Sequence, residues 1–147
     1  MNDNKESPWA GRPWYESRLR VRTYEVDVLG HVNNAVYLHY LEQAATEHAE
    51  AMGFDRARLA ELGGLFVVRR HEIDYLGAAL MGDDLRIVTW PDLIKGPRAI
   101  RCYEIRHAVS GKLLVQASTV WAWIDHNGRP RPVPRAIIDA FTAHSTS

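Results

Sequence analysis

A single long segment with helical periodicity, followed mainly by strand-like segments, limits the folds that this chain can adopt. Residues 34–51 repeat side chains suited to a core at a spacing of three and four. The side chains on this face are Tyr37, Tyr40, Leu41, Ala44, His48 and Met52. Asn33 or Asn34 can cap the start of this predicted helix, and Gly53 can end it. At about 1.5 Å per residue, the helix is expected to be roughly 27 Å long.

Alternating apolar and polar residues predict strands before and after the helix. The predicted strands cover residues 17–23, 67–75, 85–89, 99–109 and 113–124. Residues 92–94 can extend the third of these strands beyond Pro91. Shorter helices are predicted over residues 55–62 and 135–144. The last strand is apolar on both faces, which indicates either a central position in the sheet or a partner that covers its second face.

The order of these elements predicts an α+β fold in a single domain. Hairpin turns such as Ser110-Gly111 join the later strands, so their pairing is expected to be antiparallel. One long helix laid on one curved antiparallel sheet is the simplest two-layer packing for these elements. A length of 147 residues also fits one domain. Residues 1–16 contain prolines and tryptophans and are expected to form a loosely ordered N-terminal arm, with the domain over 17–147.

Charge and composition argue against several classes of function. The 18 basic and 18 acidic side chains cancel, so no overall positive field would attract nucleic acid or an anionic membrane. The longest segment without Asp, Glu, Lys or Arg has 14 residues (28–41), whereas a membrane helix needs about 20. Cys102 is the only cysteine, and the N-terminus lacks the apolar segment of a signal peptide. A cytoplasmic location is therefore expected.

Familiar catalytic and cofactor motifs are absent from the sequence. The chain has no Gly-x-Ser-x-Gly elbow, no Gly-x-Gly-x-x-Gly motif and no phosphate-loop lysine motif. His31, His39 and His48 do not form a His-Glu-x-x-His motif, and the chain has no cysteine cluster. Cys102 has no paired histidine in the sequence and is interpreted as a buried thiol. No metal and no cofactor are expected.

The segment from residue 24 to residue 37 is the candidate site, because it brings the carboxylate of Asp27, one histidine and two amides to the start of the long helix. The first turn of a helix presents unpaired N–H groups and a partial positive charge, which can polarise an acyl oxygen. Asp27 lies just before this turn and could activate a water molecule or attack directly. A thioester suits this arrangement, since a thiolate with a pKa near 8.5 leaves without a strong general acid.

Each residue of this segment also has a purely structural interpretation. Asp27 can cap a turn, Asn33 and Asn34 can simply cap the helix, and His31 can be a polar loop residue. Gly30 fits a turn that needs a positive φ. The inner-face residue Tyr37 fits the core as well as a site. Glu42, two turns into the helix, is either a second site carboxylate or a solvated charge.

Residues 21–38 resemble the signature of hotdog-fold thioesterases in the 4-hydroxybenzoyl-CoA thioesterase-like superfamily. The similarity is greatest to the long-chain acyl-CoA and acyl-carrier-protein thioesterase branches, in which Asp-Val-x-x-His-Val-Asn-Asn and a following Tyr recur. The resemblance extends by element order from about residue 17 to residue 141. It implies a long curved antiparallel sheet wrapped around a central helix. It also implies a homodimer, or a homotetramer built from dimers, with active sites at the subunit interface.

The resemblance also implies roles for individual residues. Asp27 corresponds to the catalytic carboxylate, acting as general base or nucleophile, and the N–H of Asn34 to the group that polarises the thioester carbonyl. His31 matches a histidine that is functional in the acyl-carrier-protein branch, and Tyr37 matches an aromatic residue with a packing role. That branch has Asn where this chain has Leu29, so the chain resembles the acyl-CoA branch more closely.

Coenzyme A needs cations for its phosphates. Lys95, Arg98 and Arg101 cluster in the sequence around the Gly96-Pro97 loop, and Arg69 stands on an otherwise apolar strand face. A solvated surface charge is the alternative for each of them. The full set of candidate substrate-binding residues is Asn33, Tyr37, Glu42, Arg69, Lys95, Arg98 and Arg101.

The leading hypothesis is hydrolysis of an acyl-CoA thioester to a free acid and CoA, with Asp27, His31 and Asn34 as catalytic residues. One alternative is a thioesterase acting on acyl carrier protein. A second is a hotdog hydratase or dehydratase of enoyl-CoA, which would pair Asp27 with His31. A third is a non-catalytic acyl-CoA binding module. Nucleic acid and membranes are not expected as partners.

Overall fold

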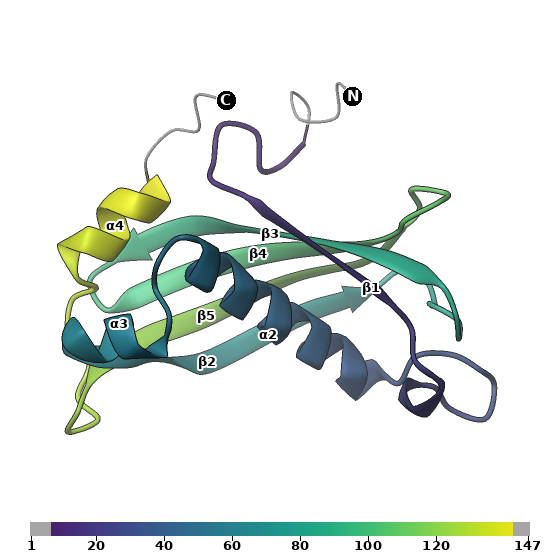
Figure 1. Cartoon of the computed structure of the whole chain (residues 1–147), viewed down its shortest axis with the longest axis horizontal. Helices are drawn as coiled ribbons and strands as arrows, with labels where there is room; N and C mark the ends of the chain where they lie inside the picture. The colour runs from purple at the N-terminus through teal and green to yellow at the C-terminus, as the bar shows by residue number, and fades with distance from the viewer. Residues whose placement is uncertain (1–6, 143–147) are drawn as a thin grey trace.

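The computed structural model describes residues 7–142, which form a five-stranded antiparallel sheet with one long helix on its inner face (Figure 1). The strands are β1 (Tyr15–Arg20), β2 (Gly64–Tyr75), β3 (Asp84–Lys95), β4 (Arg98–His107) and β5 (Leu113–Asp125). The helices are α2 (Asn34–Ala51), α3 (Arg56–Glu61) and α4 (Arg135–Thr142), with a 3-10 turn η1 (Thr23–Glu25). The strand order is β1-β3-β4-β5-β2, and every pair is antiparallel. The predicted α+β architecture is confirmed.

Helix α2 covers the inner face of the sheet with the face that its periodicity predicted. Its buried residues are Tyr37, Tyr40, Leu41, Ala44, Ala45 and His48. They pack against fully buried strand residues such as Leu85, Ile87 and Ile105. The helix begins and ends at the predicted residues, with Asn33 at the N-cap position and Gly53 at a φ of +91° just beyond its end. No helix in the described part of the chain is long and apolar enough to cross a membrane.

Two strands differ from their predicted limits for reasons of local geometry. β2 begins at Gly64, three residues before the predicted start at residue 67. A Cβ atom on Gly64 would lie 2.0 Å from the carbonyl oxygen of Ile124, so glycine allows β2 to approach β5 there. β3 continues through Pro91, where a register shift before Leu93 accommodates the missing N–H group. β5 lies between β4 and β2, so the central position predicted for it is confirmed.

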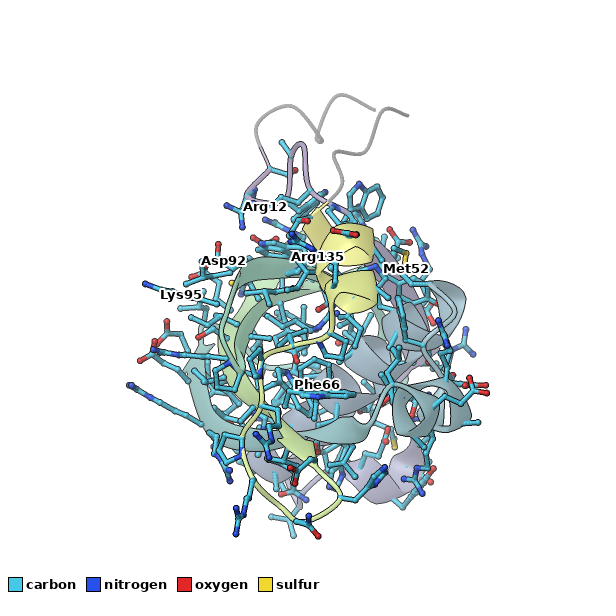
Figure 2. All side chains as sticks on the ribbon, turned by 90° about the vertical axis from the view of Figure 1, so that its left-hand side faces the viewer. Arg12, Met52, Phe66, Asp92, Lys95 and Arg135 are labelled. Carbon is cyan, nitrogen blue, oxygen red and sulfur yellow. The ribbon has the colours of Figure 1, made fainter. Side chains whose placement is uncertain are left out.

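The part of the N-terminal segment that the structure describes docks on the sheet through Trp9. Residues 1–6 of the predicted arm lie outside the described residues. Trp9 is only 2% exposed and packs against Trp90, with a ring-centroid distance of 5.3 Å, on the face opposite α2. Arg12 forms an ion pair with Asp92, and the two lie close together in Figure 2. The last two residues of the expected arm belong to β1.

A buried histidine and a half-buried arginine meet beneath the C-terminal half of α2. Arg101 Nη1 lies 2.9 Å from His48 Nδ1 and donates a hydrogen bond of 3.1 Å to the hydroxyl of Thr89. The guanidinium also lies over the ring of Phe141, 5.5 Å from its centroid. Burial, together with the nearby guanidinium, lowers the pKa of His48 from 6.5 to about 3. His48 is therefore neutral in the folded protein and accepts the hydrogen bond at Nδ1.

This lowered pKa predicts that acid destabilises the protein through His48. Between pH 6.5 and pH 3 the unfolded chain binds a proton that the folded chain does not, so the free energy of unfolding falls as the pH falls. The expected loss is about 1 kcal/mol per pH unit below 6.5. His48→Gln keeps an acceptor for Arg101 but cannot titrate. Urea titrations of both proteins between pH 7 and pH 4 test this, and a difference in unfolding free energy that is constant with pH would contradict it.

Candidate active site at the start of the long helix

A short loop folds back on itself between β1 and α2 and carries the candidate carboxylate. The N–H of Asp27 donates to the carbonyl oxygen of His31 (2.8 Å), and the N–H of Gly30 donates to that of Asp27 (3.0 Å). Gly30 has a φ of +78°, as its predicted role in a turn requires. The N–H of Val32 donates to the carbonyl of Ala79 (2.9 Å), which attaches the loop to the segment that follows β2.

Asp27 combines the structural and the chemical roles considered for it. Its Oδ1 accepts hydrogen bonds from the backbone N–H groups of Leu29 (2.9 Å) and His31 (3.1 Å), so the turn-capping interpretation is correct for this oxygen. Within residues 7–142, no hydrogen bond reaches Oδ2 of the same carboxylate. The turn therefore holds the carboxylate in one orientation and leaves one oxygen available.

The start of α2 is not capped by a side chain. Asn33 occupies the N-cap position, but its side chain makes no capping hydrogen bond, so the interpretation of Asn33 as a simple cap is wrong. The N–H of Val36 donates to the carbonyl of Asn33 (2.9 Å). The N–H groups of Asn34 and Ala35 have no backbone or side-chain acceptor among the described residues. Two donors and the positive end of the helix dipole are therefore open to a ligand.

The carboxylate and the helix start line the same open cavity, whose volume is about 670 Å³. Its lining residues are Asp27, His31, Val32, Asn33, Asn34, Ala35, Val36, Tyr37, Tyr75, Leu76, Gly77 and Ala78. Five candidate residues from the sequence thus lie on one cavity: Asp27, His31, Asn33, Asn34 and Tyr37. The volume is within the range of small-molecule sites.

The far wall of the cavity comes from the end of β2, which the sequence analysis did not include. The hydroxyl of Tyr75 donates to the carbonyl oxygen of Asn34 (3.1 Å), and the rings of Tyr37 and Tyr75 lie 5.6 Å apart. The Tyr37 hydroxyl accepts a hydrogen bond from the N–H of Ala79 (3.0 Å). Burial raises the pKa of Tyr37, so this hydroxyl stays protonated. Tyr75 is the last residue of a predicted strand, but only tertiary packing brings it to the start of α2.

The remaining candidate residues lie away from this cavity in the same chain. Glu42 is exposed on α2, and Arg69 is exposed at the register shift of β2, which explains a charge on that strand. Lys95 and Arg98 are exposed at the β3–β4 hairpin, and Figure 2 shows Lys95 projecting outward. Arg98 pairs with Ala122, seven residues along β5 from the partner of Tyr75, a distance of about 23 Å along the strand.

The expectation that Arg101 joins Lys95 and Arg98 in a cation cluster at the Gly96-Pro97 loop is wrong. Its side chain points inward to His48, because residue 101 shares a strand face with the buried residues Tyr103 and Ile105. The alternation of residues 101, 103 and 105 is visible in the sequence and could have identified Arg101 as an inward-facing residue. Among the described residues, no group of three or more His, Cys, Asp or Glu side chains could hold a metal ion.

A family model of the thioesterase-like superfamily matches residues 21–141, a range that includes every residue of the cavity. The chain belongs to this superfamily. Members adopt the hotdog fold, and this chain has it: a curved antiparallel sheet around one long helix.

Named members of the superfamily are similar over most of the chain. The acyl-CoA thioesterase YbgC of Haemophilus influenzae is 33% identical over 126 residues, which are 84% of this chain and 90% of that protein. The chloroplastic acyl-acyl carrier protein thioesterase ATL3 of Arabidopsis thaliana is 28% identical over 131 residues, 87% of this chain and 67% of that protein. A thioesterase from Thermus thermophilus, solved with coenzyme A and zinc, is 31% identical with a TM-score of 0.77, covering 89% of this chain and 92% of that one.

Proposed function

We propose that this thioesterase hydrolyses acyl-CoA thioesters to a free carboxylic acid and CoA. The observation that carries the proposal is the shared cavity, in which Oδ2 of Asp27 and the unpaired N–H groups of Asn34 and Ala35 are all available. The similarity to the acyl-CoA thioesterase YbgC and to a thioesterase bound to coenzyme A supports CoA as the thiol carrier.

In the proposed reaction, the thioester carbonyl oxygen accepts hydrogen bonds from the N–H groups of Asn34 and Ala35. Asp27 either takes a proton from a water molecule that attacks the carbonyl carbon, or attacks that carbon itself to form an anhydride that water then hydrolyses. Negative charge develops on the carbonyl oxygen, where the helix start stabilises it. In both routes the carbon–sulfur bond breaks when the tetrahedral intermediate collapses, and the CoA thiolate leaves with its bonding electron pair. In the second route this step forms the anhydride, and water hydrolyses it afterwards.

The other polar residues of the cavity receive supporting roles in this proposal. The backbone N–H of His31 positions Asp27, and His31 is one of the residues that line the cavity. The side-chain amide of Asn33 makes no capping hydrogen bond and is available to bind the substrate. Tyr37 forms part of the cavity wall. The chemistry requires neither a metal nor another cofactor.

We also propose that the site is completed in a homodimer. The outer edge of β2 pairs with no other strand among the described residues, although β2 is 12 residues long and its Tyr75 end lines the cavity. Two such edges can pair about a two-fold axis. Antiparallel pairing would bring the Gly64 end of a second copy, which is the end that carries Lys95 and Arg98, beside the first copy's site. Those cations, and Arg69 on β2, would then be near the CoA phosphates. A homotetramer could form from two such dimers.

The test is a hydrolysis assay on purified protein with acyl-CoAs of increasing chain length and with aromatic acyl-CoAs. Release of free CoA thiol from at least one of them is the expected result. An enoyl-CoA that is hydrated without thiol release would instead support a hydratase. Release from acyl carrier protein alone would support that carrier, and tight acyl-CoA binding without turnover would support a binding module.

A further inference from the structure

A tyrosine from the sheet bonds the peptide group that carries one of the two free donors at the start of α2. The Tyr75 hydroxyl donates to the carbonyl oxygen of Asn34 (3.1 Å). That carbonyl and the N–H of Ala35 belong to the same planar peptide group. A carbonyl in the first turn of a helix ordinarily accepts only the N–H four residues later. The bond from Tyr75 is therefore an additional one, made by a residue 41 positions away in the sequence.

The first turn of α2 needs to be held from outside the helix, because no side chain caps it. Helix ends fray, and a cap normally restrains the first turn by accepting hydrogen bonds from its free N–H groups. In the part of the chain that the structure describes, the contacts made to this turn leave the N–H groups of Asn34 and Ala35 unused. The N–H of Asn33 donates to the carbonyl of Glu25 (3.0 Å), and Tyr75 bonds the carbonyl of the next residue. The helix start is thus restrained without using the donors that a ligand needs.

Aromatic packing and strand pairing fix the position of Tyr75. Its ring lies 5.6 Å from the ring of Tyr37, at an interplanar angle of 57°. Tyr37 is only 2% exposed, and its hydroxyl accepts the hydrogen bond from Ala79. Tyr75 ends β2, and its backbone is paired with Val115 of β5. The hydroxyl therefore reaches α2 from a paired strand, although the side chain is 44% exposed and lines the cavity.

We propose that Tyr75 is a positioning residue that strengthens the N–H of Ala35 as a donor to the thioester carbonyl. This inference rests on the proposed function and adds a residue to its oxyanion site. A donor at a peptide oxygen draws electron density from the peptide nitrogen, so the N–H of the same group becomes a stronger donor, as along any chain of hydrogen bonds. The bond also fixes the plane of the peptide group and hence the direction of its N–H.

The effect of this bond is expected in the transition state more than in substrate binding. Negative charge develops on the thioester oxygen only as the carbonyl carbon is attacked, and a stronger donor stabilises the site most at that point. Phenylalanine would keep the aromatic ring on the cavity. Tyr75→Phe is therefore expected to lower kcat by about 3- to 10-fold, the factor that one neutral hydrogen bond contributes, and to leave KM unchanged. Tyr15→Phe removes a hydroxyl bonded to Glu47 outside the cavity and should change neither constant.

The thioester carbonyl itself reports the strength of the hydrogen bonds that it accepts. Infrared difference spectra of an isotope-labelled acyl-CoA bound to Asp27→Asn should show the carbonyl band at a lower frequency than in water. Adding Tyr75→Phe to this protein should reduce the shift, and adding Tyr15→Phe should not. An absent shift in Asp27→Asn would count against the proposed function, and this inference would fail with it. A shift that Tyr75→Phe leaves unchanged would overturn this inference alone.

The amide of Ala35 provides a measurement on the ligand-free protein that does not depend on turnover. Loss of the hydrogen bond to the Asn34 carbonyl should move the Ala35 amide resonance in Tyr75→Phe, whereas the amide resonance of Arg56 at the start of α3 should stay in place. A lower kcat with an unmoved Ala35 resonance would mean that the hydroxyl acts on the substrate directly, which would overturn the inference. A purely structural contact would lower the melting temperature of Tyr75→Phe but leave kcat and the carbonyl band unchanged, and that result would overturn it too.

Discussion

Replacing Asp27 by Asn is expected to lower kcat for acyl-CoA hydrolysis by about 10²- to 10⁴-fold. The amide can neither take a proton from water nor attack the thioester. The fold should persist, because the amide oxygen of Asn can still accept the hydrogen bonds from the backbone N–H groups of Leu29 and His31. Stopped assays of thiol release measure the loss, and the melting temperature should stay within a few degrees of the wild type.

A matched control exists in the same chain. Asp55 also accepts a backbone hydrogen bond, from Arg58 (2.8 Å) at the start of α3, but it lies outside the cavity. Asp55→Asn should therefore leave kcat unchanged. Full activity in Asp27→Asn would remove the carboxylate from the mechanism, whatever the control does.

Replacing Asn34 by Pro is expected to lower kcat by about 10²- to 10³-fold, the usual effect of deleting one oxyanion donor. Proline has no N–H, so the substitution deletes one of the two donors at the helix start. The first helical position tolerates proline, since its N–H has no partner within the helix. Asn33 has a ψ of 138°, outside the α region that a following proline disfavours.

Two companion variants separate the lost N–H from other effects of this substitution. Asn34→Ala keeps the N–H and removes the side chain, so it should retain most activity. Arg56→Pro makes the same backbone change at the first position of α3, where Asp55 has φ −72° and ψ 176°. It should leave kcat unchanged. If Asn34→Pro keeps full activity with normal circular dichroism, this N–H does not polarise the thioester.

The elements set by local sequence were predicted well. The limits of α2 match because periodicity and flanking residues both act within a few residues of each end. β2 and β3 were harder because their limits depend on strand pairing. Gly64 is in a strand because it can approach Ile124, and Pro91 stays in a strand because a bulge follows it.

The site residues show the same difference between local sequence and tertiary packing. Asp27, His31, Asn33 and Asn34 could be found together, because they lie in one continuous loop that leads into the helix. Tyr75 lies 41 residues from Asn34 and meets it only through the packing of β2 beside α2. The alternation along the strand indicates that Arg101 faces inward. Its closeness in sequence to Lys95 and Arg98 led instead to its assignment to the cation cluster.

The uncapped start of α2 has a consequence for engineering this protein. The side chain of Asp55 caps the start of α3, whereas no side chain caps the start of the long helix α2. A side-chain cap typically adds about 1 kcal/mol of stability. Introducing Ser or Asp in place of Asn33 would follow the usual recipe for heat resistance. Here the new side chain would accept a hydrogen bond from the N–H of Ala35, one of the two donors in the proposed reaction, so gains in heat resistance and in turnover would compete at one residue.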